Sequence, residues 1–185
     1  MSLNLAVKLF SFTLLAIIIV TVAGSTPAQT PATLDSLNRL IGKWVGEGTS
    51  EVGAGGGYFT FEKSLNGRVL IRKNRADYPA TKDRPAVTHE DLMVVYPDAT
   101  TKQLRGFYTD SEGNTINYLI TVSADGKTIA FLSDGRDPGP RYRLTYVLIT
   151  AEAITLTFEI ASPDQPDQFR KIIDGKVRKV AASKP

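Results

Sequence analysis

From residue 43 onward, hydrophobic and polar residues alternate in short runs that turn residues separate. Alternation with a period of two is typical of β-strands with one buried and one exposed face. The pattern predicts ten strands, over residues 43–50, 57–65, 68–76, 88–96, 102–109, 115–123, 127–133, 141–149, 153–161 and 168–179. The last run contains Asp174-Gly175, so a bent strand and a small hairpin are both open there.

The connections between these runs indicate how the strands are joined. Asn66-Gly67 is a two-residue hairpin signal, and Asp125-Gly126 divides a later pair of strands. Consecutive strands joined by tight turns form an up-and-down meander, and closing such a meander removes its exposed edges. We therefore predict an all-β, antiparallel up-and-down barrel of about ten strands, with a two-sheet sandwich as the alternative.

A short amphipathic helix is predicted before the first strand, over residues 33–41. Thr33 can cap its start, Leu37 lies on an apolar face with Leu34 and Leu40, and Gly42 is placed to end it. We expect this helix to plug or cover one end of the barrel.

The first 28 residues have the pattern of a secretory signal peptide. Lys8 precedes an apolar run over residues 9–23, and small residues follow it up to Ala28. Cleavage can follow Ala23 or Ala28, and we favour Ala28. The product is then a periplasmic or secreted protein with no membrane attachment; an uncleaved membrane anchor is the alternative. Residues 29–32 are then a linker, and residues 33–185 form a single barrel domain.

Composition excludes several classes of function. The net charge of +3 is spread among acids and bases, which describes a solvated surface and not a nucleic-acid footprint. The chain has no cysteine, so disulfides, thiol catalysis and thiolate metal sites are ruled out. No nucleophile elbow, phosphate-binding loop or paired-histidine metal spacing is present.

The predicted strand over residues 88–96 carries the strongest candidate for chemistry. His89 and Asp91 share one face of it with Met93 and Val95. If that face points inward, His89 and Asp91 are neighbours that could fix a polar ligand group or act in acid–base catalysis. The alternative is a histidine at the barrel mouth that hydrogen bonds to backbone or to a carboxylate.

Four further residues are candidate ligand contacts: Trp44, Arg105, Tyr118 and Tyr146. Trp44 lies between closely spaced glycines and either fills the closed end of the barrel or stacks on a ligand. The tyrosines offer an apolar ring with one hydrogen-bonding group, which suits a mixed cavity, or they are ordinary packing residues. Arg105, on the face of Phe107, either anchors a carboxylate such as a fatty acid or forms a structural ion pair.

Several of these stretches resemble a known group of barrels. Gly42-Lys43-Trp44-Val45-Gly46-Glu47-Gly48 after a helix, with Phe59-Thr60-Phe61-Glu62 and Leu65-Asn66-Gly67-Arg68-Val69-Leu70, resembles the opening of the nitrobindin-like barrels. His89-Glu90-Asp91-Leu92, Leu104-Arg105-Gly106-Phe107-Tyr108 and the Asp110–Gly113 turn are more similar to a bacterial lipocalin-like family, domain of unknown function 1579. The resemblance covers roughly residues 34–180 and implies a ligand-binding barrel.

The resemblance also raises the question of haem. Nitrobindins hold haem through a histidine near the C-terminal strand, with a second one on the opposite wall. His89 is the only histidine here and matches the opposite-wall position, so the iron-ligating histidine is absent. We therefore predict no cofactor. Haem stays the alternative that the resemblance raises.

Three functions remain open. The first is an exported, non-catalytic carrier of a small hydrophobic or amphipathic molecule, with long connections over residues 77–86 and 133–140 at the mouth. The second is a small-molecule isomerase or hydrolase that uses His89 and Asp91. The third is an envelope protein-interaction module with a filled barrel, and a homodimer is an open alternative in each case.

Overall fold

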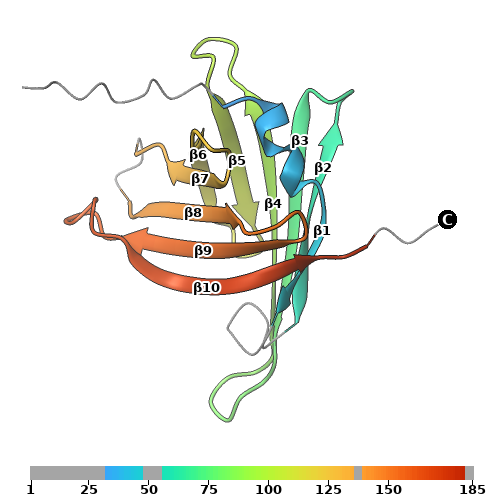
Figure 1. Cartoon of the computed structure of the whole chain (residues 1–185). Coiled ribbons are helices and arrows are strands. Elements are labelled where there is room, and N and C mark those ends of the chain that lie inside the picture. Colours follow the sequence, from blue (N-terminus) through green and yellow to red (C-terminus); the bar gives the residue numbers. More distant parts are fainter. Residues whose placement is uncertain (1–31, 48–55, 136–138, 182–185) are drawn as a thin grey trace, which may run out of the picture.

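The ten predicted strands are present in the computed structural model and close into one antiparallel barrel (Figure 1). The structure describes residues 32–47, 56–135 and 139–181, so the predicted signal peptide and most of the glycine-rich segment at 53–57 lie outside the described residues. The elements are η1 (Leu34–Leu40), β1 (Gly42–Glu47), β2 (Gly57–Ser64), β3 (Val69–Tyr78), β4 (Val87–Pro97), β5 (Leu104–Asp110), β6 (Thr115–Val122), β7 (Thr128–Ser133), β8 (Arg141–Leu148), β9 (Ala153–Ala161) and β10 (Arg170–Lys179). The predicted up-and-down barrel is confirmed.

Each strand pairs with its neighbours in the sequence, and β1 pairs with β10 to complete the ring. The segment around Asp174-Gly175 is one strand, because β10 pairs with β9 along its length with a register shift between Lys171 and Ile173. Figure 1 shows β10 curving around the lower side of the barrel. Among the described residues, no helix has the length and apolar character needed to cross a membrane.

One detail of the predicted turns is wrong. The Asn66-Gly67 connection is a four-residue turn over residues 65–68, closed by the Ser64–Val69 pair, and not a two-residue hairpin loop. Leu65, Asn66 and Gly67 all have positive φ angles, and the Gly67 amide donates to the Ser64 carbonyl. The extra residues spread the chain reversal over a run of left-handed conformations, which asparagine and glycine tolerate well.

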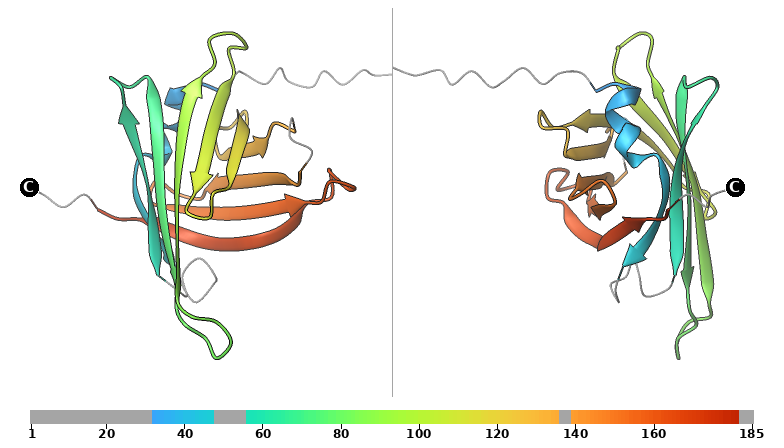
Figure 2. Two further views of the ribbon diagram at one scale, coloured as in Figure 1. Left: turned by 180° about the vertical axis from the view of Figure 1, so that it is seen from behind. Right: turned by 45° about the vertical axis from the view of Figure 1, so that its right-hand side comes forward.

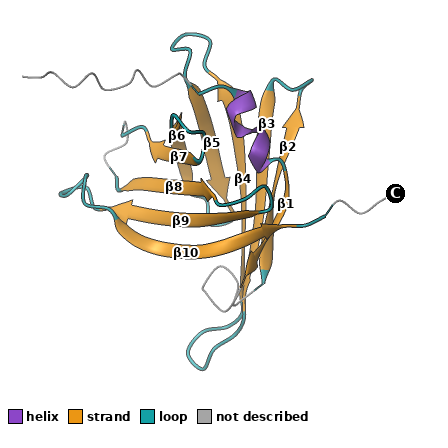
Figure 3. Cartoon of the chain, viewed as in Figure 1, coloured by secondary structure: helices purple, strands orange, loops and turns teal. Residues whose placement is uncertain are grey.

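The predicted helix is present as a 3₁₀-helix, and it covers one end of the barrel (Figure 3). Leu37 and Leu40 are fully buried, and the Trp44 indole Nε1 donates a 2.7 Å hydrogen bond to the Leu40 carbonyl. This bond satisfies a carbonyl at the helix end and ties η1 to β1. The helix therefore closes the end at which β1 begins and β10 finishes.

The opposite end of the barrel is where β2, β4, β6, β8 and β10 begin. The connection between β3 and β4 extends from this end, away from η1, as both views in Figure 2 show. The predicted connection at 133–140 also leaves from this end, after β7, although part of it lies outside the described residues. We call the end covered by η1 the closed end and the other the open end.

Candidate functional site

A cavity of about 630 Å³ lies inside the barrel and reaches toward the open end. Small-molecule sites usually measure roughly 300–1,000 Å³, so this cavity has the size of a ligand site. Below it, toward the closed end, a layer of buried aromatic and aliphatic side chains fills the barrel, among them Phe61, Phe131, Tyr146 and Leu148. The barrel is therefore packed in its closed half and hollow in its open half.

One wall of the cavity is apolar and comes from β8, β9 and β10. Tyr142 on β8 and Phe158 on β9 stack with their ring centroids 6.1 Å apart. The other apolar lining residues of these strands are Leu144, Leu156, Ile160, Ile172, Ile173 and Val177. Strand alternation points these residues inward, and the register shift in β10 brings both Ile172 and Ile173 to the lining.

The facing wall, from β3, β4 and β5, is polar, and a buried ion pair lies at its centre. The Arg72 guanidinium on β3 binds the Asp91 carboxylate on β4, and their side chains are only 6% and 5% exposed. Asn74 Nδ2 donates a 3.0 Å hydrogen bond to the same carboxylate. Arg72 also lies over the Phe59 ring, 5.3 Å from its centroid. A paired and hydrogen-bonded charge is the form in which a barrel interior can hold an arginine.

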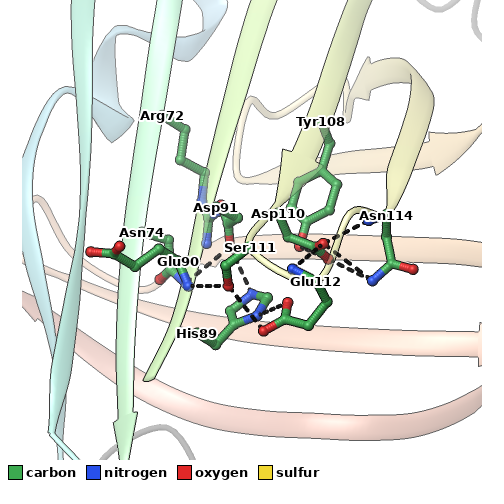
Figure 4. A network of polar contacts seen from close by, with 10 residues as sticks. All are labelled: Arg72, Asn74, His89, Glu90, Asp91, Tyr108, Asp110, Ser111, Glu112 and Asn114. Carbon is green, nitrogen blue, oxygen red and sulfur yellow. Dashed lines mark hydrogen bonds and ion pairs between the residues drawn. The ribbon is translucent and has the colours of Figure 1, made fainter. Parts of the chain in front are cut away.

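His89 lies between two carboxylates at the mouth of the cavity (Figure 4). Its Nε2 is 3.3 Å from Asp91 Oδ2, and its Nδ1 is 2.7 Å from Glu112 Oε2, on the turn after β5. The hydrogen bond to Asp91, reinforced by Glu112 and opposed by partial burial, raises the pKa of His89 from 6.5 to about 9. The ring is therefore an imidazolium at neutral pH and donates from both nitrogens.

A second set of hydrogen bonds rigidifies the neighbouring turn (Figure 4). Asp110 accepts bonds from the backbone amides of Glu112 and Asn114 and from the Asn114 side chain. The Tyr108 hydroxyl also donates to Asp110, over 3.3 Å. Burial raises the pKa of Asp110, but the bonds from Asn114 outweigh it and hold this pKa below its usual value. The turn thus fixes Glu112 beside His89.

The buried tyrosines of the site stay neutral. Burial raises the pKa of Tyr108, Tyr118 and Tyr146, and nearby Asp91 acts in the same direction. Burial lowers the pKa of Arg72, but Tyr146 and Asp91 together raise it further, so Arg72 stays charged. The three hydroxyls therefore keep their protons at physiological pH and can act as hydrogen-bond donors, as the Tyr108 hydroxyl does to Asp110.

Four of the six predicted site residues line the cavity: Trp44, His89, Asp91 and Tyr118. His89 and Asp91 share one face of β4 with Met93 and Val95, as the strand pattern predicted, and the structure shows that this face points inward. Trp44 is fully buried and stacks on Phe59, so it packs the core and also presents its ring to the cavity. Tyr146 is fully buried but lies outside the lining, in contact with Phe61 and Phe131.

Arg105 lies outside the cavity lining. It is on the face of β5 opposite to Tyr108, where its guanidinium is 2.9 Å from Asp98 and 3.2 Å from Asp134. Of the two roles that the sequence leaves open for Arg105, the structure supplies the partners for an ion pair. The arginines that line the cavity are Arg72, Arg75 and Arg84; of these Arg72 is buried, and its strand lies two strands from β5 in the barrel.

The sequence reasoning missed Arg72, Asn74, Tyr108 and Glu112. Arg72 and Asn74 alternate with Ile71 and Lys73, so neither face of this strand has a consistent polarity to show which side is buried. The Asp110–Gly113 turn is part of the family resemblance, but the sequence does not show which residues it lies beside. The position of Glu112 beside His89 depends on the pairing of β4 with β5, which the pattern of a single strand does not contain.

His89, Asp110 and Glu112 each offer a ligand atom within 4.8 Å of the others, which is a spacing that a metal ion could use. However, Asp110 holds its turn through several hydrogen bonds, and both ring nitrogens of His89 already face carboxylates. The same engagement of His89 leaves no ring nitrogen directed at a haem iron. The residues present therefore do not fit the haem site that the resemblance implies, and they form a hydrogen-bonded network.

No protein-family model matches this chain, and no curated protein is significantly similar to it. The geometry defines the class of protein instead: a closed antiparallel ten-stranded barrel with an internal cavity that opens at one end.

Proposed function

We propose that this protein is a non-catalytic carrier that holds a small amphipathic molecule inside the open half of its barrel. The observation that carries the proposal is the cavity of about 630 Å³ with one apolar wall and one polar wall. The apolar wall of β8–β10 can accept the hydrophobic side of a ligand, while the polar wall can orient its polar group. The interaction module requires a filled barrel, so the cavity gives that hypothesis less support than it gives the carrier.

The environment of His89 favours binding over acid–base catalysis. With a pKa of about 9, only about one molecule in a hundred carries the neutral imidazole at pH 7. A general base works best when its pKa lies near the operating pH, so His89 is a poor base and a firm hydrogen-bond donor. The isomerase or hydrolase hypothesis thus has less support than the carrier.

The wider biological setting is proposed on the sequence alone. The pattern of residues 1–28 supports export, followed by cleavage and residence in the periplasm or outside the cell. The motifs around Trp44, His89 and Asp110 support membership of the domain of unknown function 1579 family. The architecture is compatible with that membership, which a family-wide alignment would test.

Native mass spectrometry of the purified protein tests for a retained ligand as an added mass. In parallel, we expect the uncharged dye N-phenyl-1-naphthylamine to bind with increased fluorescence. Leu144→Trp fills the cavity from β8 and should abolish dye binding. Val147→Trp adds the same ring on the outer face of the same strand, where Val147 is exposed, and should leave binding unchanged.

Two outcomes would overturn the carrier proposal. One is a folded wild-type protein with neither a retained mass nor dye binding. The other is dye binding that survives Leu144→Trp, because the dye would then lie outside the barrel.

A further inference from the structure

The charges around Asp91, in the polar wall of the cavity, are already matched by one another. Arg72 and Asp91 neutralise each other in the buried centre of the polar wall. At the mouth, the His89 imidazolium is held by Glu112 as well as by Asp91. A ligand that reaches the centre of this wall therefore meets no unpaired cation, although the exposed Arg84 lines the mouth, over the Tyr78 ring.

Next to this cluster, Asp110 adds a negative charge near the mouth. Asp110 lines the cavity and accepts hydrogen bonds from amides and a hydroxyl, and no ion pair joins it to a cation among the described residues. An anionic ligand would approach this carboxylate and would have to displace Asp91 to reach Arg72. A cationic ligand would find Asp91 occupied by three donors, from Arg72, Asn74 and His89. In the buried centre of the wall, either charge would lose its hydration without gaining a free counter-ion.

An uncharged hydrogen-bonding group does remain available. Tyr118 lines the cavity from β6, and no described residue forms a hydrogen bond with its hydroxyl. Its ring is held at the edge of Tyr108 and Phe131, with centroids 6.3 Å and 6.1 Å away. A rigid neutral hydroxyl can donate to a carbonyl or hydroxyl oxygen of a ligand without a charge on either side.

We propose that the ligand is an uncharged amphipathic molecule with a hydrogen-bond acceptor, and that Asp91 is a built-in counter-ion that excludes carboxylates from Arg72. This inference rests on the carrier function and names the ligand class for the same cavity. It replaces the fatty-acid type of ligand that a buried arginine suggests from sequence. Asp91 occupies the position on Arg72 that a ligand carboxylate would take.

Three probes of equal ring size and different charge test this selectivity: 2-naphthamide, 2-naphthoate and 2-naphthylmethylammonium. Their binding to the full chain at neutral pH can be followed through the fluorescence of Trp44, the single tryptophan, which lines the cavity. We expect the amide to bind about tenfold or more tightly than either charged probe. Equal or tighter binding of the carboxylate or of the ammonium would overturn the inference.

The variant Asp91→Asn tests the counter-ion directly. It keeps the shape of the side chain and leaves Arg72 without its carboxylate, so 2-naphthoate affinity should rise by about tenfold or more. The matched control Asp98→Asn removes a carboxylate from Arg105, outside the cavity, and should leave the probe ranking unchanged. An unchanged ranking in a folded Asp91→Asn would overturn the counter-ion role.

The unpaired Arg72 could prevent Asp91→Asn from folding, so the double variant Arg72→Gln/Asp91→Asn provides a second measurement. The double variant lacks the Arg72–Asp91 ion pair and has an uncharged side chain at both positions. It should keep the preference for 2-naphthamide, and its affinity for 2-naphthoate should not rise. A gain of 2-naphthoate binding without Arg72 would overturn the role of Asp91. Failure of the carrier function is distinguishable, because then none of the three probes binds the wild-type protein.

Discussion

At the residue scale, Asp91 joins the two polar centres of the barrel. One of its oxygens faces Arg72, while the other faces Asn74 and His89. Removing one partner from a buried ion pair typically costs about 3–5 kcal/mol, because the other charge stays buried without compensation. The orientation of the whole polar wall therefore depends on this carboxylate more than on any surface charge of the barrel.

The raised pKa of His89 makes the stability of the fold depend on pH. Its pKa is about 9 in the folded state against 6.5 in the unfolded chain, so the folded state binds the proton more tightly. The resulting stabilisation is complete below pH 6.5 and is lost as the pH rises through 9. With allowance for solvent around the partly exposed ring, we expect a loss on the order of 2 kcal/mol. Urea unfolding of wild type and His89→Gln across this range measures it.

The comparison with His89→Gln cancels the contribution of the other titrating groups. The difference in unfolding free energy between the two proteins should shrink as the pH rises from 6.5 to 9, and a constant difference would contradict the prediction. His89 is the only histidine, so its titration can also be followed by NMR without assignment. Glu112→Gln should lower the pKa of His89, because it removes one of the two carboxylates.

At the element scale, the start of β2 depends on a glycine. Gly57 has a φ of +146°, and a Cβ built there would lie 2.5 Å from the Arg75 carbonyl oxygen on β3. Gly57→Ala must therefore move the backbone of β2 or β3, and we expect it to destabilise the protein by about 2 kcal/mol or more. Chemical denaturation measures the change.

Gly113→Ala is the matched control for that prediction. Gly113 also has a positive φ, +86°, but a Cβ there meets no heavy atom within 4 Å. Gly113→Ala should destabilise the protein only through backbone strain at the positive φ, by about 1 kcal/mol. Equal destabilisation by the two substitutions would show that the close approach of β2 to β3 does not matter.

The elements were more predictable from sequence than the site was. Strand positions follow from alternation and turn residues, which are local, and nearly every predicted strand matches an observed one within a few residues. The face that His89 and Asp91 share on β4 was predictable, but the side on which it lies was not, because Leu92 and Val94 make the other face apolar as well. The polar cluster of the cavity wall could not be predicted. Arg72 and Glu112 come beside His89 and Asp91 only through the pairing of β3, β4 and β5.

At the scale of the whole molecule, closure divides the barrel into a packed half and a hollow half. The closed half contains η1, Trp44 and a layer of large side chains that supplies the apolar burial. The open half can then hold a cavity and a buried ion pair, although neither is a favourable contribution to folding. The separation explains how one small domain can combine a stable core with a binding site.

Closure also predicts that the barrel unfolds as one unit. The seam between β1 and β10 joins the two ends of the chain, so losing any strand opens the ring and exposes two edges. We expect Trp44 fluorescence, which reports on β1, and far-UV circular dichroism, which reports on all strands, to give the same urea midpoint. Ile154→Ala, in the buried layer of β9, should lower both midpoints together, with a loss of about 2–5 kcal/mol. Separate midpoints, or a shift in one signal alone, would mean that the hollow half opens while the packed half stays folded.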